Sequence, residues 1–133
     1  MCIRDRNIAE WTLSESNIDL MILCLGANDM LRGINPKETK NNLEEIIKIA
    51  KSKNIKVIIV GMIAPTSYGF VYKESFDKIF YDLSKKYKLQ LIPFLLEGVA
   101  QKPEFNLSDG MHPNDQGTII IGNTLKNAIL ENL

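Results

Sequence analysis

Three short apolar runs, separated by stretches with helical spacing, constrain the fold of this chain more than any other feature. The runs cover residues 19–25, 55–62 and 89–94 and are rich in Leu, Ile and Val. Runs of this kind are typical of strands buried on both faces of a parallel sheet. The pattern therefore predicts an α/β fold of the three-layer, flavodoxin-like type with a parallel sheet. Three strands are few for the helices present, so we expect one or two further strands upstream.

The stretches between the runs predict helices with recognisable starts. Asn35 fits an N-cap and Pro36 the first helical position, and Asn54 ends that helix. A second helix follows a loop over residues 64–72, and a last helix begins near Asn114. These assignments leave three loops at strand ends and one before the last helix, and in an open parallel sheet such loops carry the functional groups.

The first six residues are charged and non-periodic, unlike the rest of the chain. We interpret residues 1–6 as a foreign leader and residues 7–133 as the domain. No apolar stretch is long enough for a membrane span, and the N-terminus lacks a signal-peptide core. Of the two cysteines, Cys24 lies in the first apolar run, where we expect it buried, and a disulfide framework is not expected.

The charge balance excludes an obvious polyanion partner. The chain has 16 basic and 16 acidic side chains, and its lysines are spread along the sequence instead of forming a stripe. We therefore expect no nucleic-acid binding and no stable membrane insertion. The expected partner is a small neutral or amphipathic molecule, and the expected state is a monomer.

The only histidine stands three residues after an aspartate in a loop that contains glycine and proline. This spacing allows the carboxylate of Asp109 to accept a hydrogen bond from Nδ1 of His112, with Nε2 facing outward. Such a pair is the orienting half of a Ser-His-Asp triad. Two other interpretations stay open: an aspartate that caps a turn beside a packing histidine, and a metal site that also uses Asp115.

A second polar group follows the first apolar run. Gly26 ends the run, and Asn28 is placed to donate its amide N–H to an oxyanion, since a small preceding residue allows close approach. The alternative for Asn28 is an Asx-turn. For Asp29 we expect a structural role, in which the carboxylate accepts backbone N–H bonds.

Together these two groups resemble the SGNH, or GDSL-like, family of serine hydrolases. Residues 25–29 (Leu-Gly-Ala-Asn-Asp) are similar to its Gly-x-Asn-Asp block, and residues 109–113 (Asp-Gly-Met-His-Pro) to its Asp-x-x-His-Pro block. The flanking sequence resembles the bacterial branch known as acyl-CoA thioesterase I, arylesterase and lysophospholipase; it lies at residues 30–33, 68–69, 92–94 and 102–103.

The resemblance implies hydrolysis of acyl esters and thioesters without a metal or organic cofactor. By position, His112 would be the general base, Asp109 its orienting partner, Asn28 an oxyanion donor and Gly26 the support of that loop. The loop over residues 64–72 would border the acyl pocket. Its expected substrate contacts are Pro65, Ser67, Tyr68 and Gly69. The resemblance also implies a periplasmic or secreted protein.

The family's nucleophile is the one part that the sequence does not supply. Its Gly-Asp-Ser block and its oxyanion glycine should precede the helical pattern near Ile8, and neither is present. Of the seven serines only Ser67 falls near the expected rim, and no strained strand-to-helix turn presents it. We therefore expect a chain without ordinary esterase turnover. The alternatives are a catalytically inactive SGNH-like binding module and an unrelated flavodoxin-like domain.

Overall fold

The computed structural model describes residues 2–132, which form two compact units. The first unit extends to Pro93 and the second begins at Phe94. The boundary predicted after residue 6 stays a prediction, and one helix continues across it. Each unit is described by itself.

The first unit is built on a three-stranded parallel sheet, which confirms the predicted α/β class. The strands are β1 (Leu20–Leu23), β2 (Lys56–Val60) and β3 (Gln90–Ile92), in the order β1-β2-β3. All three are shorter than the apolar runs that predicted them. β1 ends before Cys24, so the prediction that Cys24 is buried within the strand is wrong: its side chain is exposed.

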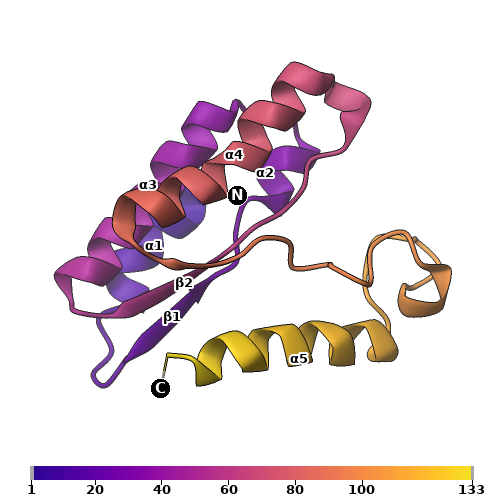
Figure 1. Ribbon diagram of the computed structural model, residues 1–133. Coiled ribbons are helices and arrows are strands. Elements are labelled where there is room, and N and C mark those ends of the chain that lie inside the picture. Colours follow the sequence, from indigo (N-terminus) through magenta and orange to yellow (C-terminus); the bar gives the residue numbers. More distant parts are fainter. Residues whose placement is uncertain (1, 133) are drawn as a thin grey trace. The chain divides into compact units, whose positions relative to one another are not determined.

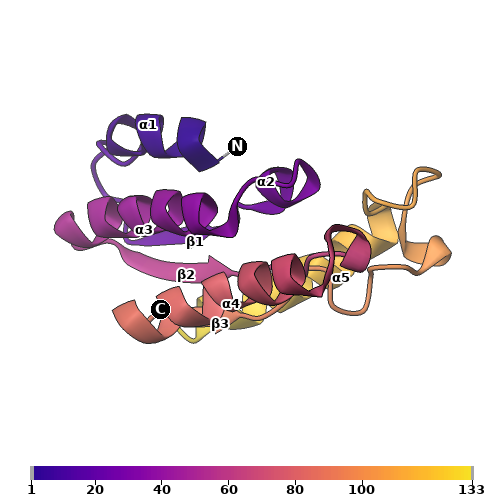
Figure 2. The ribbon, with the colours of Figure 1, turned by 90° about the horizontal axis from the view of Figure 1, so that it is seen from above.

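Three helices of the first unit lie on one face of its sheet (Figures 1 and 2). The helices of this unit are α1 (Cys2–Thr12), α2 (Ala27–Leu31), α3 (Pro36–Ser52) and α4 (Phe70–Tyr87), with a 3-10 turn η1 (Thr66–Tyr68). α3 packs between α1 and α4. The helices and β2 share one core. The helices contribute Leu43, Ile47, Phe76 and Phe80 among others, and β2 contributes alternate residues such as Val57. This core fixes the ends of the strands where the candidate residues lie.

The helix starts follow the sequence in one case and depart from it in another. Asn35 caps α3 by accepting a hydrogen bond from the backbone N–H of Lys37 (2.9 Å), with Pro36 in the first turn as predicted. α4 begins at Phe70, so the predicted loop over residues 64–72 is shorter than expected. Gly69, with φ +85°, provides the turn into that helix.

The second unit consists of turns, a 3-10 turn η2 (Pro103–Phe105) and one long helix, α5 (Asp115–Leu130). Asn114 caps α5 as predicted, with its side-chain oxygen accepting from the backbone N–H of Gly117 (3.0 Å). A Cβ at Gly117 would lie 2.2 Å from the carbonyl oxygen of Phe105, so only glycine fits at this close approach. The first turn of α5 is thereby held against the loop that precedes it.

Candidate functional site

Asp109 and His112 form a hydrogen-bonded pair in the second unit, with the geometry that the sequence predicted. His112 Nδ1 lies 2.6 Å from one carboxylate oxygen of Asp109. The other oxygen accepts the backbone N–H groups of Met111 (2.8 Å) and His112 (2.9 Å). These bonds lower the pKa of Asp109 to about 2, and the largest cause is the backbone N–H of His112, followed by its ring. The carboxylate is therefore ionised at neutral pH.

The loop that carries this pair is closed by its own backbone. The N–H of Leu107 donates to the carbonyl of His112 (2.7 Å), and the N–H of Gly110 donates to the carbonyl of Leu107 (2.9 Å). Gly110 has a φ of +68°, a left-handed conformation that glycine adopts at low cost. These bonds, which shape the turn over residues 107–112, all come from within a few residues of Asp109.

The arrangement gives the imidazole a defined chemical role. Because a carboxylate only accepts, Nδ1 carries the proton, and Nε2 is left as the acceptor. The side chain of His112 is 71% exposed, so Nε2 is available to a reacting hydroxyl. Ser67, the serine that the sequence placed nearest the expected rim, is exposed within η1 of the first unit.

The second candidate group, at the end of β1, is held by a buried carboxylate. Asp29 is 2% exposed and accepts hydrogen bonds from the backbone N–H of Cys2 (3.1 Å) and the hydroxyl of Thr39 (3.1 Å). This confirms the structural role predicted for Asp29. Asn28 is exposed, and it lies in the first turn of α2, where the sequence analysis expected a loop. Its side chain is thus accessible beside a rigid anchor.

Glycine is favoured at position 26 by its backbone conformation, and its neighbours are core aromatic residues. Its φ is +116°, and a Cβ at this position would lie 3.4 Å from the ring of Phe80 and 3.6 Å from that of Phe76. The residue caps α2 and is itself buried. From the sequence, Gly26 is expected to allow close approach of a substrate; in the structure it also packs against two core aromatic residues.

Pockets lie beside both groups, one in each unit. The first, of about 180 Å³, is lined by Cys24, Gly26 and Asn28 among others in the first unit. The second, of about 410 Å³, is lined by Lys102, Ser108 and other residues of the second unit. Gly26 and Asn28 therefore border space that a small molecule can enter. The second pocket is lined by the neighbours of Asp109 in the chain, but by neither Asp109 nor His112.

The predicted substrate-contact residues lie in and around η1, and Tyr68 among them contacts the end of α2 and the residues that follow it. Pro65 leads into η1, which holds Ser67 and Tyr68, and Gly69 follows it. The hydroxyl of Tyr68 donates to the carbonyl of Leu31 (2.8 Å). A Cβ at Gly33 would lie 3.1 Å from the Tyr68 ring. This contact between Gly33 and Tyr68 was not predicted from the sequence, in which the two residues are far apart.

Two negative findings apply to the described part of the chain. Residues 2–132 contain no group of three or more His, Cys, Asp and Glu side chains placed to hold a metal ion. The same residues include no helix with the length and apolar character needed to cross a bilayer. The assignment of Gly26 and Asn28 to one reacting centre with Asp109 and His112 stays a prediction.

Comparison with known proteins gives a consistent family. A sequence model of the GDSL-like Lipase/Acylhydrolase family matches residues 4–118. The chain is 38% identical over 104 residues to an arylesterase of Vibrio mimicus, a match that covers 78% of this chain and 52% of that protein. It is also 38% identical over 90 residues to thioesterase 1/protease 1/lysophospholipase L1 of Escherichia coli (strain K12), covering 68% of this chain and 43% of that protein.

Solved structures agree with these relatives. The crystal structure of TesA superimposes with a TM-score of 0.92 at 27% identity, covering all of this chain and 74% of that one. AlinE4, an esterase of the SGNH-hydrolase family, gives a TM-score of 0.79 at 32% identity and covers 100% of this chain and 71% of its own. The chain spans about half the length of the curated relatives it matches.

Proposed function

Because the chain belongs to the GDSL-like lipase/acylhydrolase family, we propose that it serves hydrolysis of acyl esters or thioesters by a Ser-His-Asp mechanism. The observation that carries this proposal is the 2.6 Å hydrogen bond between Asp109 and Nδ1 of His112. The nucleophilic serine is not among these 133 residues in any recognisable block. The proposal therefore concerns the base, its orienting partner and one oxyanion donor.

In this mechanism His112 moves a proton twice. Nε2 takes the proton of the serine hydroxyl as its oxygen attacks the substrate carbonyl, and the imidazolium then gives that proton to the leaving alcohol or thiol. Water attacks the acyl-enzyme with His112 again as base; the imidazolium then gives that proton to the serine oxygen as the carboxylic acid is released. Asp109 fixes the tautomer and stabilises the imidazolium, and its low pKa keeps it ionised throughout.

Asn28 is the proposed side-chain donor to the oxyanion. Its exposed amide lies in the first turn of α2, next to the buried Asp29 that anchors the turn. A donor on such an anchor is preorganised, and removal of one donor typically lowers the rate on the order of a hundredfold. Gly26 supports this position because its φ of +116° is one that other residues rarely adopt.

The substrate is proposed to contact Pro65, Ser67, Tyr68 and Gly69. The bond from Tyr68 to Leu31 ties this turn to α2, the element that carries Asn28. The relatives named arylesterase and thioesterase 1/lysophospholipase L1 support an acyl substrate with an aromatic, thiol or lipid leaving group. No metal or organic cofactor takes part in this proposal.

A second candidate is a catalytically inactive SGNH-like binding module, the alternative that the sequence leaves open. In that case the pockets beside the two candidate groups would hold an acyl ligand without turnover.

A chimera separates the two candidates. The portion of the Vibrio mimicus arylesterase that this chain does not match would be joined ahead of it, and both proteins treated with a fluorophosphonate probe and a p-nitrophenyl acyl ester. We expect no labelling and no turnover of the chain alone, and labelling with turnover of the chimera that is lost on His112→Ala. A folded chimera that is not labelled would favour the binding module.

Two further results would contradict parts of the proposal. Enzyme-like turnover by the chain alone, lost on His112→Ala, would show that it contains its own nucleophile. Full activity of a chimera with His112→Ala would remove His112 from the mechanism. An exposed control, Asn123→Ala in α5, should leave turnover unchanged.

A further inference from the structure

The net charge of the chain is zero, but basic and acidic side chains are strongly segregated along the sequence. Residues 36–88 contain eleven lysines, no arginine and six carboxylates, a formal charge of +5. The rest of the chain contains five basic and ten acidic side chains, a formal charge of −5. The basic segment corresponds to α3, β2 and α4, with the turns between them.

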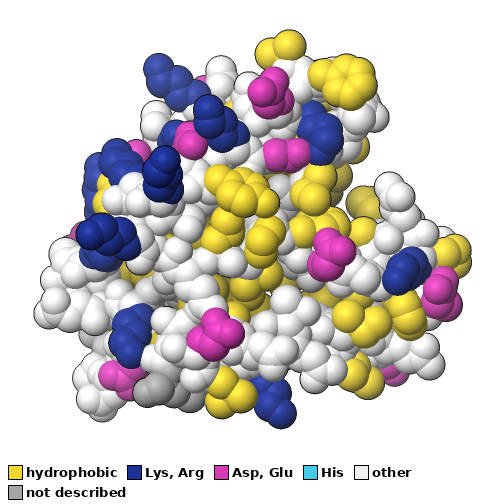
Figure 3. Space-filling model, viewed as in Figure 1, with side chains coloured by type: hydrophobic (Ala, Val, Ile, Leu, Met, Phe, Trp, Pro, Cys, Tyr) yellow, Lys and Arg dark blue, Asp and Glu magenta, His cyan; other side chains and the backbone are white. Residues whose placement is uncertain are grey.

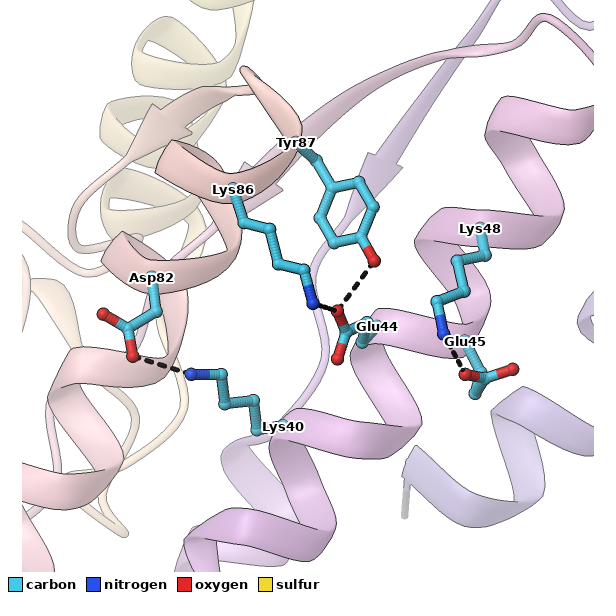
Figure 4. A network of polar contacts seen from close by, with 7 residues as sticks. All are labelled: Lys40, Glu44, Glu45, Lys48, Asp82, Lys86 and Tyr87. Atoms are coloured by element: carbon cyan, nitrogen blue, oxygen red, sulfur yellow. Dashed lines mark hydrogen bonds and ion pairs between the residues drawn. The ribbon is translucent and has the colours of Figure 1, made fainter.

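Most carboxylates of this segment are neutralised by neighbouring lysines. Four ion pairs do this: Lys40 with Asp82 (2.7 Å), Lys48 with Glu45 (2.7 Å), Lys73 with Asp77 (2.5 Å) and Lys86 with Glu44 (Figure 4 shows all but the third). Tyr87 also donates to Glu44 (2.7 Å). The pairs account for four of the six carboxylates and leave Glu38 and Glu74.

Six exposed lysines are left without an ion pair among the described residues, and we call them the lysine face. They are Lys37, Lys51, Lys53, Lys78, Lys85 and Lys88. Lys78 and Lys85 are seven residues apart and lie on the side of α4 opposite its buried residues, which include Phe76 and Leu83. Because α3 and α4 pack side by side, their outward sides form one surface, and Figure 3 shows lysine and arginine side chains gathered over it.

Helix stability explains only part of this lysine face. Lys51, Lys53, Lys85 and Lys88 lie in or next to the last turns of their helices, where a positive charge is favourable. Lys37 lies in the first turn of α3, where a positive charge is unfavourable, and Lys78 lies in the middle of α4. The charge preference of helix ends therefore does not account for these two lysines.

We propose that the lysine face docks the first unit on an anionic lipid surface. Clustered ammonium groups near a membrane are attracted by anionic headgroups, and tyrosine is favoured at the membrane interface. Tyr81, 54% exposed, lies between Lys78 and Lys85 on α4. The face has no arginine, the residue that predominates in base-specific contacts to nucleic acid, which favours lipid. This inference does not depend on the nucleophile or on the hydrolase chemistry.

The test is sedimentation of the purified chain with vesicles. One set contains phosphatidylglycerol and phosphatidylcholine, and the other contains phosphatidylcholine alone. We expect binding to the anionic set only, weakening as salt rises. The triple variant Lys37→Gln, Lys78→Gln, Lys85→Gln should lower the partition coefficient about 100-fold. A matched control, Arg4→Gln, Lys102→Gln, Lys126→Gln, removes the same charge elsewhere and should lower it far less.

Several outcomes would overturn the inference. One is equal sedimentation with both vesicle sets, and another is an equal loss in the control variant. A lower melting temperature of the triple variant with unchanged vesicle binding would assign the lysines to helix stability alone. Binding to duplex DNA that depends on these lysines, without vesicle binding, would assign the face to nucleic acid.

Discussion

Asp29 and Asp109 each shape a candidate loop, but they do so in opposite surroundings. Asp29 is 2% exposed and accepts from Cys2 and Thr39, which are 27 and 10 positions away. The side chain of Asp109 is 44% exposed and accepts from residues two and three positions away. The first loop is therefore held by tertiary structure, whereas the second is held by its own sequence.

The difference predicts unequal consequences for folding when either carboxylate is removed. Asp29→Ala leaves a buried backbone N–H and a buried hydroxyl without an acceptor and also opens a cavity. We expect it to lower the free energy of unfolding by about 3 kcal/mol. Urea denaturation followed by circular dichroism measures this loss.

Asp109→Ala is the matched control for that measurement. Its donors are exposed and can turn to water, so we expect a smaller loss than for Asp29→Ala. Equal losses at the two positions would show that the contrast between tertiary and local anchoring is wrong.

The two glycines beside these carboxylates extend the comparison. Gly26→Ala must hold alanine at φ +116° with its Cβ against Phe80, and we expect a loss of about 2 kcal/mol or more. Gly110→Ala needs only the left-handed region (φ +68°), with no atom within 4 Å of its Cβ, and should lose about 1 kcal/mol. Thermal unfolding of both variants measures the two losses of stability. A larger loss in Gly110→Ala than in Gly26→Ala would contradict the prediction.

A smaller effect isolates one of the two bonds to Asp29. Thr39→Val removes the hydroxyl donor and keeps the shape of a fully buried side chain, so we expect a loss of about 1–2 kcal/mol. Thr39→Ser keeps the donor and removes a methyl group. A larger loss in the serine variant than in the valine variant would mean that packing at Thr39, and not its bond, supports the loop.

The same contrast explains what the sequence could and could not predict. The Asp109 and His112 pair was predicted with its bond geometry because all of its partners lie within one short loop. The α/β class was predicted because apolar runs and helical spacing are local patterns. By contrast, Thr39 as the partner of Asp29 depends on how α3 lies relative to α2, which no local pattern specifies.

Element ends were predicted less well, for a related reason. The sequence placed Cys24 inside a buried strand, but β1 ends at Leu23, where its pairing with β2 ends. Likewise, part of the segment 64–72 that was expected to be a loop forms η1 and the first residues of α4. The interpretation that the lysines are spread along the chain is also wrong: residues 36–88 contain eleven of them, and α3 and α4, which carry eight of these, are neighbours.

The smallest expected effect on stability is the most direct probe of the exposed loop. The carboxyl of Asp109 should titrate with a pKa of about 2, compared with about 3.9 for an unperturbed aspartate. Because the folded-state pKa is the lower one, the bonds stabilise the loop above about pH 4, and that stability is lost as the pH falls toward 2. Carbon-detected NMR of the carboxyl group follows this titration.

His112→Ala divides the causes of that low pKa. The variant removes the ring bond but keeps the backbone N–H groups of residues 111 and 112, and the backbone bond of residue 112 is the largest cause. The pKa of Asp109 should therefore rise and still stay below the ordinary value. A full return to about 3.9 would mean that the ring alone holds the carboxylate. In that case the shape of the loop would depend on the ring of His112. The backbone N–H bonds that Asp109 and Leu107 accept argue against such a dependence.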